Sequence, residues 1–288
     1  MNEAIRPRRS VLYMPGSNAR ALEKARALAA DALILDLEDA VAPDAKALAR
    51  EQVAAAVKAR GFGKREIAIR INALSTPWGA DDLKAALAAK PDAVLAPKIS
   101  TARDVAEVEA RMRDAGVALW VMIETPLAIL NLAPIAAAGG RLACFVMGTN
   151  DLVKEFQGRH TPDRQNLSAA LTLSVAAARA HGLAVLDGVY NDIRNASGFA
   201  EACAQGRAFG FDGKTLIHPS QIAPANAAFA PDAAEVEDAR RIIAAFDAPE
   251  NASKGAIALD GRMVERLHAD IARRTVALAD AIAELEPA

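Results

Sequence analysis

Acidic side chains and one arginine stand where short apolar segments of this sequence end. In the segment Leu33–Glu38, Asp36 and Glu38 fall on the face opposite the leucines, because successive side chains of a strand point to opposite faces. The segment Ile67–Asn72 places Arg70 opposite its isoleucines in the same way. If helices cover the outer face of the sheet, the apolar faces lie outside and these three charged side chains point inward.

Further carboxylates follow two later apolar segments. Glu124 ends the segment Trp120–Glu124, and Asp151 comes shortly after the segment Leu142–Gly148. Unpaired buried carboxylates are costly and raise one another's pKa, whereas a divalent cation removes that cost. Mg²⁺ is usually held by one or two carboxylates with water and substrate, and Mn²⁺ suits the same ligands, so the pattern predicts a Mg²⁺ site. The predicted rim gathers Asp36, Glu38, Asp39, Arg70, Glu124 and Asp151.

Each of these residues also has a purely structural interpretation. Asp39 can cap a helix, Arg70 can pair with a buried acid, and Asp151 can begin a turn. The four histidines are scattered and have no zinc-site spacing. The joint position of Arg70, Glu124 and Asp151 at strand ends favours a catalytic site, because barrel enzymes place their chemistry at that end.

The elements that must position these residues alternate along the chain, which is typical of βαβ units. Eight strand–helix pairs in order predict the α/β class and a closed (β/α)₈ TIM barrel. A doubly wound open sheet is the alternative, but the first turn, Tyr13–Asn18, lacks the GxGxxG pattern. Strands are predicted at Ser10–Met14, Ala32–Leu37, Glu66–Asn72, Ala93–Lys98, Leu119–Glu124, Leu142–Gly148, Ala184–Val189 and Arg207–Asp212. Helices are predicted at Asn18–Ala30, Ala45–Arg60, Gly79–Ala88, Ala102–Asp114, Pro126–Ala138, Asp163–His181, Ile193–Gln205 and Pro219–Ala228.

A tail remains after the eighth unit. Asp232–Phe246 is a predicted helix, Asp247–Gly255 is polar and predicted to be flexible, and Met263–Glu284 is a predicted long helix. A tail beyond a closed barrel usually covers its own mouth or that of a neighbour. The sequence therefore predicts one barrel domain over residues 1–230 and a helical lid extension over residues 231–288.

Composition excludes several classes of protein. Hydrophobic residues make up 52% of the 288 residues and charged residues 24%, which predicts a large core and no disorder. The net charge of −2 gives no basic excess for binding nucleic acid or an anionic membrane. No apolar segment reaches the length of a membrane span or signal peptide. Cys144 and Cys203 form no CxxC pair and are expected to be buried free thiols, which favours a reduced, cytoplasmic protein.

Six motifs occur in an order that is far more specific than any one of them. They are Arg9–Gly16, Leu35–Val41, Arg70–Asn72, Ile123–Pro126, Gly148–Leu152 and Ile217–Ile222. The set resembles the citrate lyase β-subunit-like family of the phosphoenolpyruvate/pyruvate barrel superfamily, which includes malyl-CoA, β-methylmalyl-CoA and citramalyl-CoA lyases. The resemblance covers nearly the whole chain, from Arg9 to the last helix.

The resemblance implies roles for residues of the rim. Glu124 and Asp151 match the family's Mg²⁺ ligands, and Arg70 matches the arginine that holds the substrate oxygens. Glu38 and Asp39 match an acidic pair that contacts the metal through water. Further positions match contacts to coenzyme A or substrate, although a solvated helix and a neutral structural histidine are equally good interpretations of them: Tyr13, Arg20, Lys24, Ile217 and His218.

Two departures from the family pattern stand out. Asn150 replaces the glutamate that many members carry before the metal-binding aspartate, which removes one negative charge. The lid motif Gly-x-Met-Ile-Asp, whose aspartate is the acid/base that reaches a neighbouring subunit, is here Gly261–Glu265. Glu265 keeps the carboxylate but adds a methylene, and a displacement of about 1 Å can cost ~10²-fold in rate. Asp260 is the alternative acid/base, and Glu265 can instead form surface ion pairs on the last helix.

The resemblance implies a Mg²⁺-dependent lyase that cleaves or forms a 3-hydroxyacyl-CoA such as malyl-CoA, β-methylmalyl-CoA, citramalyl-CoA or citryl-CoA. The products would be an acyl-CoA and a 2-oxo acid, and the shared lid implies a homotrimer or hexamer. The open alternatives are a malyl-CoA-type thioesterase, a 2-oxo acid aldolase that acts on free acids without coenzyme A, and a citrate lyase β subunit that works only in a complex. Lys98, placed by alternation on the inward face with Val94 and Ala96, could form an imine, but a metal site already supplies the electron sink.

Overall fold

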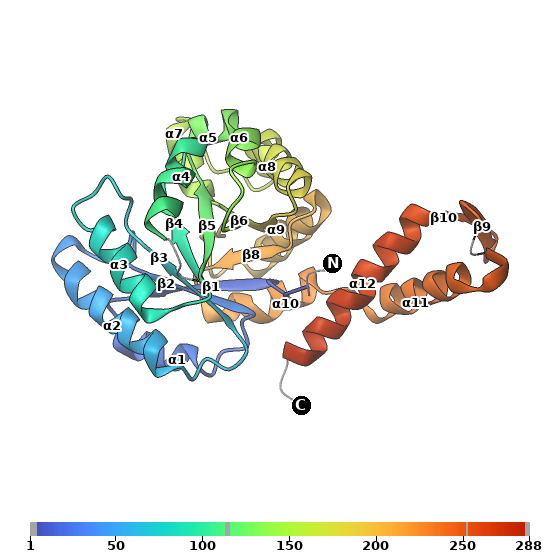
Figure 1. Ribbon diagram of the computed structural model, residues 1–288, viewed down its shortest axis with the longest axis horizontal. Coiled ribbons are helices and arrows are strands. Elements are labelled where there is room, and N and C mark those ends of the chain that lie inside the picture. Colours follow the sequence, from blue (N-terminus) through green and yellow to red (C-terminus); the bar gives the residue numbers. More distant parts are fainter. Residues whose placement is uncertain (1–4, 113–115, 252, 286–288) are drawn as a thin grey trace. The chain divides into compact units, whose positions relative to one another are not determined.

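The computed structural model describes residues 5–112, 116–251 and 253–285 (Figure 1). The chain divides into two compact units. One unit spans Arg8–Phe229, and the other consists of the described residues that precede and follow it.

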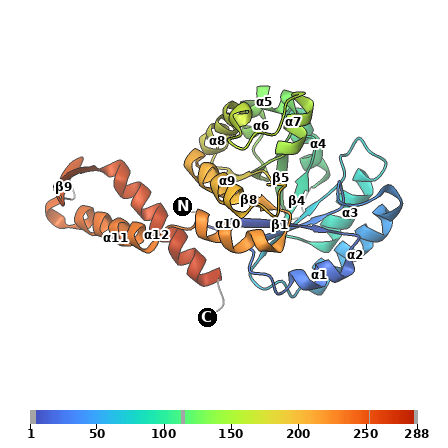
Figure 2. The ribbon, with the colours of Figure 1, turned by 180° about the vertical axis from the view of Figure 1, so that it is seen from behind.

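The Arg8–Phe229 unit is a closed barrel in which each strand pairs in parallel with the next and β8 pairs with β1. Figures 1 and 2 show the helices arranged around the outside of these strands. The predicted (β/α)₈ barrel is therefore confirmed. The strands are β1 (Ser10–Pro15), β2 (Ala32–Asp36), β3 (Glu66–Arg70), β4 (Ala93–Ala96), β5 (Ala118–Ile123), β6 (Leu142–Met147), β7 (Ala184–Asp187) and β8 (Gly213–Leu216).

The helices that cover the barrel match the predicted sites, with several differences in extent. The segment predicted as Pro126–Ala138 is two short helices that meet at Asn131, and an additional helix, α7, follows β6 directly. The α-helices are α1 (Ala19–Ala25), α2 (Lys46–Ala59), α3 (Gly79–Ala89), α4 (Ala102–Arg111), α5 (Pro126–Leu130), α6 (Leu132–Ala136), α7 (Thr149–Glu155), α8 (Ser168–Ala180), α9 (Ala196–Phe209) and α10 (Ile222–Phe229). The 3₁₀ turns are η1 (Pro43–Ala45), η2 (Gln165–Leu167) and η3 (Pro219–Gln221).

Two apolar layers hold the barrel, and the alternation of the strands separates them. Ile34, Ala68 and Trp120 belong to the inner cluster, which fills the barrel. The isoleucines of β3 and the leucines of β2 belong to the outer cluster, between strands and helices. The faces predicted for the residues of β2, β3 and β5 are therefore correct.

The alternation was misjudged on β4. Val94 and Ala96 lie in the outer cluster, whereas Ala93 and Leu95 lie in the inner one. The strand ends at Ala96, before Pro97, and Lys98 has a positive φ of 57°. Extrapolating the strand pattern to Lys98 was wrong, because the backbone leaves the extended conformation before that residue.

The eighth strand was placed too early. Residues 207–209 continue α9, which ends at Gly210 in the left-handed region with φ of 94°. The strand is the next segment, Gly213–Leu216, so the predicted strand Arg207–Asp212 was wrong. The sequence hid it because Lys214, a polar residue in a short segment, is fully buried there.

The second unit is a pair of helices with a hairpin between them. Helices α11 (Ala233–Asp247) and α12 (Arg266–Leu285) lie side by side in both ribbon views. Strands β9 (Ala256–Leu259) and β10 (Arg262–Glu265) form an antiparallel pair between them, after η4 (Pro249–Asn251). The predicted helix start at Met263 was therefore wrong. A small core of Phe246, Ile257, Val264 and Ala269 joins hairpin and helices.

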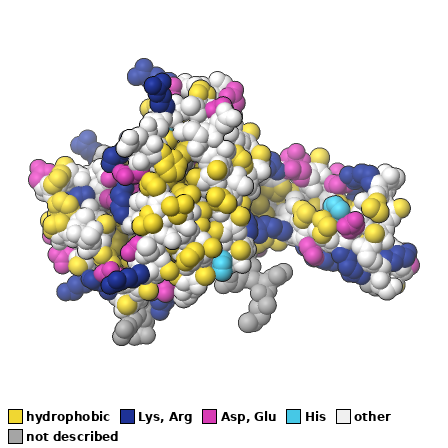
Figure 3. Space-filling model, turned by 90° about the horizontal axis from the view of Figure 1, so that it is seen from above, with side chains coloured by type: hydrophobic (Ala, Val, Ile, Leu, Met, Phe, Trp, Pro, Cys, Tyr) yellow, Lys and Arg dark blue, Asp and Glu magenta, His cyan; other side chains and the backbone are white. Residues whose placement is uncertain are grey.

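The surface carries both signs of charge. On the face shown in Figure 3, Lys and Arg side chains are interspersed with Asp and Glu side chains. Within the described ranges, no helix has both the length and the hydropathy of a membrane span.

Candidate active site at the carboxyl ends of the strands

Arg70, the last residue of β3, is held at the rim by Asp36, the last residue of β2. Its Nε and Nη2 atoms donate to the two carboxylate oxygens of Asp36 at 2.7 and 2.6 Å. Asp36 also accepts from the backbone N–H groups of Glu38 and Ala40, at 2.9 and 3.1 Å. Two adjacent strand ends thus fix one guanidinium in a bidentate, buried pair. The sequence pattern predicts only that Asp36 faces inward; in the structure it holds the guanidinium of Arg70 in place.

The third guanidinium nitrogen, Nη1, faces the acidic pair that follows β2. It lies 2.9 Å from Glu38 Oε2, a contact at ion-pair distance without hydrogen-bond geometry, and 3.5 Å from Asp39 Oδ2. Glu38 is buried, whereas the side chain of Asp39 is 63% exposed. Burial raises the pKa of Glu38 to about 8, because it outweighs the nearby charge of Arg70 and is reinforced by Asp39.

Tyr13 of β1 lies beneath this guanidinium. The Cζ atom of Arg70 is 4.7 Å from the centroid of the Tyr13 ring, a cation–π geometry. The Tyr13 hydroxyl donates to the sulfur of Met122 at 3.5 Å. Burial raises the pKa of Tyr13, although Arg70 opposes the shift, so the phenol keeps its proton at neutral pH. The ring therefore holds Arg70 from one side while its hydroxyl remains a donor.

Glu124 and Asp151 form a second group, bridged by Lys98. The backbone N–H of Lys98 donates to Glu124 Oε1 at 2.7 Å, and its ammonium donates to Asp151 Oδ1 at 2.8 Å. The same ammonium lies 3.4 Å from Glu124 Oε1. The left-handed conformation of Lys98 lets backbone and side chain reach the two acids together. The sequence suggests Lys98 only as an imine former and does not reveal this bridge.

One oxygen of Glu124 is left without a partner. Glu124 is fully buried, and its Oε2 atom has no hydrogen bond. Burial raises the pKa of Glu124, and Lys98 opposes that shift. A buried carboxylate oxygen normally finds a donor, so such an exception calls for an explanation in terms of a ligand or an ion.

A glycine lets the chain pass close to this oxygen. A Cβ atom at Gly148 would lie 2.7 Å from Glu124 Oε2 and would also clash with Glu124 Cβ. Gly148 is the N-cap of α7, whose first turn carries Asp151. The glycine therefore sets how closely the two carboxylates approach each other.

The Glu124 and Asp151 pair fits a divalent cation that binds oxygen. Two carboxylates, one of them with a buried unpartnered oxygen, are the number that Mg²⁺ commonly takes from protein, with water completing the octahedron. Among the described residues, no three His, Cys, Asp or Glu side chains gather as a metal-binding group, so a full protein cage is not formed there. A site with few protein ligands leaves positions for substrate.

The motif after β8 is held by internal hydrogen bonds. Gln221 is buried, and its Oε1 accepts from the backbone N–H groups of Ile217 and His218 at 3.0 and 3.2 Å. His218 Nδ1 accepts from the N–H of Ser220 at 3.2 Å, as an N-cap, which requires that nitrogen to be unprotonated. The structure therefore favours the structural interpretation of His218, while its role toward substrate stays a prediction.

Arg20 and Lys24 lie on α1 with exposed side chains. Lys24 is in the last turn of that helix, where a cation interacts favourably with the helix dipole. Neither residue is brought into contact with the rim residues by a hydrogen bond or ion pair within the described part of the chain, and their role toward a thioester stays a prediction.

The candidate acid/base residues lie in the second unit. Glu265 ends β10, and its backbone N–H donates to His268 Nδ1 at 2.9 Å. Asp260 sits in the hairpin turn with φ of 52° and pairs with Arg241 at 3.1 Å. The surface ion pair considered for Glu265 on a final helix is absent from the described residues, and Glu265 precedes that helix.

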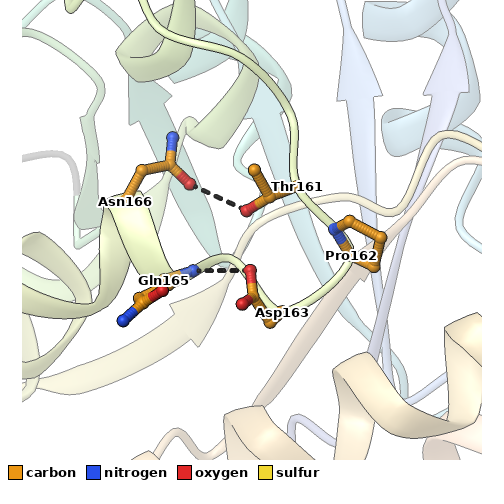
Figure 4. A pocket seen from close by; sticks show the side chains of 5 residues that line it. All are labelled: Thr161, Pro162, Asp163, Gln165 and Asn166. Atoms are coloured by element: carbon orange, nitrogen blue, oxygen red, sulfur yellow. Dashed lines mark hydrogen bonds between the residues drawn. The ribbon is translucent and has the colours of Figure 1, made fainter.

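The structure also contains an open hollow formed by residues between α7 and α8. Thr161, Pro162, Asp163, Gln165 and Asn166 line it, with a volume of about 560 Å³ (Figure 4). Its polar groups bond within the loop, from Thr161 Oγ1 to Asn166 and from the Gln165 N–H to Asp163. It shares no lining residue with the rim, and ligand sites are normally more enclosed.

Known proteins resemble this chain over almost its entire length. The family model described as HpcH/HpaI aldolase/citrate lyase matches residues 9–219. A (3S)-malyl-CoA thioesterase of Cereibacter sphaeroides is 51% identical over 98% of each chain. The citrate lyase subunit beta of Escherichia coli is 36% identical over 96% of this chain and 94% of that protein. The structure of CitE from Mycobacterium tuberculosis in complex with magnesium, acetoacetate and coenzyme A is 31% identical, with a TM-score of 0.78 over 95% of this chain and 98% of that one.

The family match spans the whole rim, including Arg70, Glu124 and Asp151. The resemblance predicted from the six ordered motifs is confirmed, and so is the prediction of a lyase-type enzyme family. The chain belongs to the HpcH/HpaI aldolase/citrate lyase family.

Proposed function

We propose that this protein is a Mg²⁺-dependent enzyme that hydrolyses a malyl-CoA-type thioester to free coenzyme A and a 2-hydroxy diacid. The buried Glu124 carboxylate carries the proposal, because its Oε2 lacks a partner and Asp151 stands beside it across Lys98. The magnesium in the Mycobacterium tuberculosis relative supports the choice of ion, and the thioesterase at 51% identity supports the choice of substrate and reaction.

In this proposal Glu124 and Asp151 hold the ion, and Lys98 keeps the two carboxylates apart and in register. When bound, Mg²⁺ supplies a Lewis acid for the 2-hydroxy acid oxygens. Arg70, fixed by Asp36, places positive charge where negative charge develops on the substrate oxygen. Because Nε and Nη2 are engaged by Asp36, Nη1 is the nitrogen that faces the substrate, with Glu38 and Asp39 beside it.

Glu265 is the proposed acid/base. Its carboxylate has no ion pair in the described part of the chain, whereas that of Asp260 is paired with Arg241. In hydrolysis, Glu265 would accept a proton from the attacking water and return it to the leaving thiolate. As in the family pattern, the residue would act from the C-terminal extension of a neighbouring subunit in a homo-oligomer.

Carbon–carbon cleavage is the second candidate. The citrate lyase subunit beta at 36% identity favours it, and the same rim residues would serve it. In that reaction Arg70 would stabilise the alkoxide that becomes the 2-oxo acid, and Glu265 would protonate the enolate carbon of the acyl-CoA. The two reactions differ in the bond that breaks, so their products distinguish them.

The test is product analysis with the purified full chain, Mg²⁺ and (3S)-malyl-CoA. Hydrolysis releases malate and free coenzyme A, whereas carbon–carbon cleavage releases glyoxylate and acetyl-CoA. We expect free coenzyme A and malate, lost in the presence of EDTA and in Glu124→Gln. Acetyl-CoA with glyoxylate would replace the first candidate by the second.

Citramalyl-CoA and citryl-CoA extend the panel. Their hydrolysis releases citramalate or citrate with free coenzyme A, whereas carbon–carbon cleavage releases pyruvate or oxaloacetate with acetyl-CoA, so the products identify both the substrate and the reaction. The Glu265→Gln and Asp260→Asn variants separate the two acid/base candidates. Retained turnover in Glu265→Gln together with lost turnover in Asp260→Asn would transfer the role to Asp260. Turnover that survives both EDTA and Glu124→Gln would overturn the metal site itself.

A further inference from the structure

A buried ion network lies outside the barrel interior, at the carboxyl end of β7. Asp187 accepts from Arg164 Nη1 at 2.7 and 2.8 Å and from Lys214 Nζ at 2.8 Å. Asp187 and Lys214 are fully buried. They alternate with Leu186 and Thr215, so they face the helical layer rather than the barrel interior. A Cβ at Gly206 of α9 would lie 2.9 Å from Asp187 Oδ2, which shows how closely that helix covers the network.

The network also forms hydrogen bonds with Gly188, the residue that follows β7. The N–H of Gly188 donates to Asp187 Oδ1 at 2.8 Å, and the ammonium of Lys214 donates to the carbonyl oxygen of Gly188. Both backbone polar groups of Gly188 are therefore held by the same ion pair. Burying two full charges is expensive, so an arrangement that uses them to fix a single backbone position invites a functional reason.

The fixed glycine rests against the start of α7. A Cβ at Gly188 would lie 2.6 Å from Cγ2 of Thr149 and would also clash with its Oγ1. Thr149 is the first residue of α7, and Asp151 follows two residues later in the same turn. The position of the β7 end is thus transmitted by direct contact to the turn that carries Asp151.

A second contact joins the same two segments. Asn150 Nδ2 donates to Asn191 Oδ1 at 3.1 Å, and Asn191 Nδ2 donates to Asn150 Oδ1 at 2.8 Å. This amide pair uses Asn150, the position where many family members carry glutamate. The loop after β7 therefore contacts the first turn of α7 at two consecutive residues, Thr149 and Asn150.

We infer that the Arg164–Asp187–Lys214 network is a positioning element that sets Asp151 for the metal ion, acting through Gly188 and the first turn of α7. The inference rests on the proposed Mg²⁺ site of Glu124 and Asp151. Substituting a residue that holds a metal ligand in position, without itself binding the metal, typically lowers metal affinity 10- to 100-fold.

The test is Mg²⁺ binding by isothermal titration calorimetry on the full chain, together with urea unfolding. Asp187→Asn is expected to weaken Mg²⁺ binding about tenfold. The matched control is Asp31→Asn, which breaks another buried Asp–Arg pair, with Arg9, at the opposite end of the barrel. Both variants lose stability, but the control keeps its Mg²⁺ affinity within about twofold.

A surface variant covers the case in which Asp187→Asn does not fold. Asn191 is exposed, and Asn191→Ala removes only the two hydrogen bonds of the amide pair. Because exposed hydrogen bonds contribute little each, the variant is expected to weaken Mg²⁺ binding about threefold. The inference is overturned if Asp187→Asn binds Mg²⁺ as tightly as the Asp31→Asn control does. If Asp187→Asn does not fold, it is overturned if Asn191→Ala binds Mg²⁺ as tightly as wild type.

Failure of the proposed function looks different. If wild type binds no Mg²⁺, or if Glu124→Gln binds it as tightly as wild type, the metal site is wrong and the inference falls with it. If Glu124→Gln abolishes binding while Asp187→Asn matches its control, the metal site stands and only the positioning role is lost.

Discussion

The two ends of the barrel use the same types of residue in opposite ways. At the amino ends of the strands, Arg8 donates to both oxygens of Glu66 at 2.6 and 2.9 Å, and Arg9 donates to both oxygens of Asp31 at 2.9 Å. At the carboxyl ends, Arg70 is paired with Asp36 as fully, but Glu124 keeps one buried oxygen without a partner.

The difference separates stability from function. A buried carboxylate that is bidentate to arginine has its charge and its lone pairs largely satisfied. It therefore closes the base of the barrel without needing a further ligand or ion. A buried carboxylate with an unpartnered oxygen costs stability, and barrel enzymes place such costs at the carboxyl ends of the strands, where loops and substrate meet. Changes to the arginine-paired carboxylates of the amino end are thus expected to lower stability and leave activity intact, whereas changes to Glu124 at the carboxyl end are expected to lower activity and leave stability intact.

The strongest contrast is expected from Glu124→Gln. Turnover of the thioester should fall by about 10²–10³-fold, because the ion loses one of its two charged protein ligands. The free energy of unfolding without metal should stay the same or rise, because burial raises the pKa of Glu124 and the neutral amide avoids the desolvation of its charge. Steady-state kinetics and urea unfolding in EDTA measure both. A large loss of stability with retained turnover would reverse the assignment of this end to function.

Asp31→Asn is the counterpart at the amino end. It leaves the Arg9 guanidinium buried beside a neutral amide, and breaking a buried ion pair from one side costs about 3–5 kcal/mol of unfolding free energy. The folded fraction should keep kcat/KM within about a factor of two, since distant sites are nearly independent. Urea unfolding and kinetics on the same preparation check this, and a fall in kcat/KM comparable to that of Glu124→Gln would remove the contrast between the ends.

The faces of Asp36, Arg70 and Glu124 could be predicted from the sequence, because strand alternation is local and their strands are extended up to those residues. The bridge made by Lys98 could not, because the residue lies beyond Pro97 in a left-handed conformation that ends the alternation.

The burial of a charged residue, Lys214, could not be predicted from the sequence either. Lys214 made Gly213–Leu216 look too polar for a barrel strand, and its counter-ion Asp187 lies 27 positions away in the sequence. Such a strand is stable only once its tertiary partners are in place, so local pattern cannot reveal it. The hairpin before α12 could not be predicted for a related reason. Its residues Ile257 and Val264 are buried by packing against Phe246 and Ala269 of the two helices, and local pattern does not show that packing.

A smaller effect is expected from pH, through Glu38. Burial raises its pKa to about 8 from an ordinary value near 4.5, so the folded state binds a proton that the unfolded state releases between these values. The resulting stabilisation is complete below the ordinary pKa and is lost as pH rises toward 8, with a slope of up to about 1.4 kcal/mol per pH unit. Urea unfolding in EDTA at several pH values between 5 and 8 measures the slope. Glu38→Gln should flatten the curve, and an unchanged slope in that variant would assign the dependence to another group.

The smallest effect is expected at His218, a polar rim residue whose Nδ1 already caps η3. His218→Ala should cost about 1 kcal/mol of unfolding free energy, because it removes the cap of η3. His218→Asn keeps a capping oxygen and should restore most of that loss, with turnover within about twofold of wild type in both variants. Kinetics and urea unfolding of the two variants decide the matter. If turnover falls in His218→Asn while stability is restored, His218 contacts the substrate and belongs with Glu124 among the groups that this end of the barrel keeps for function.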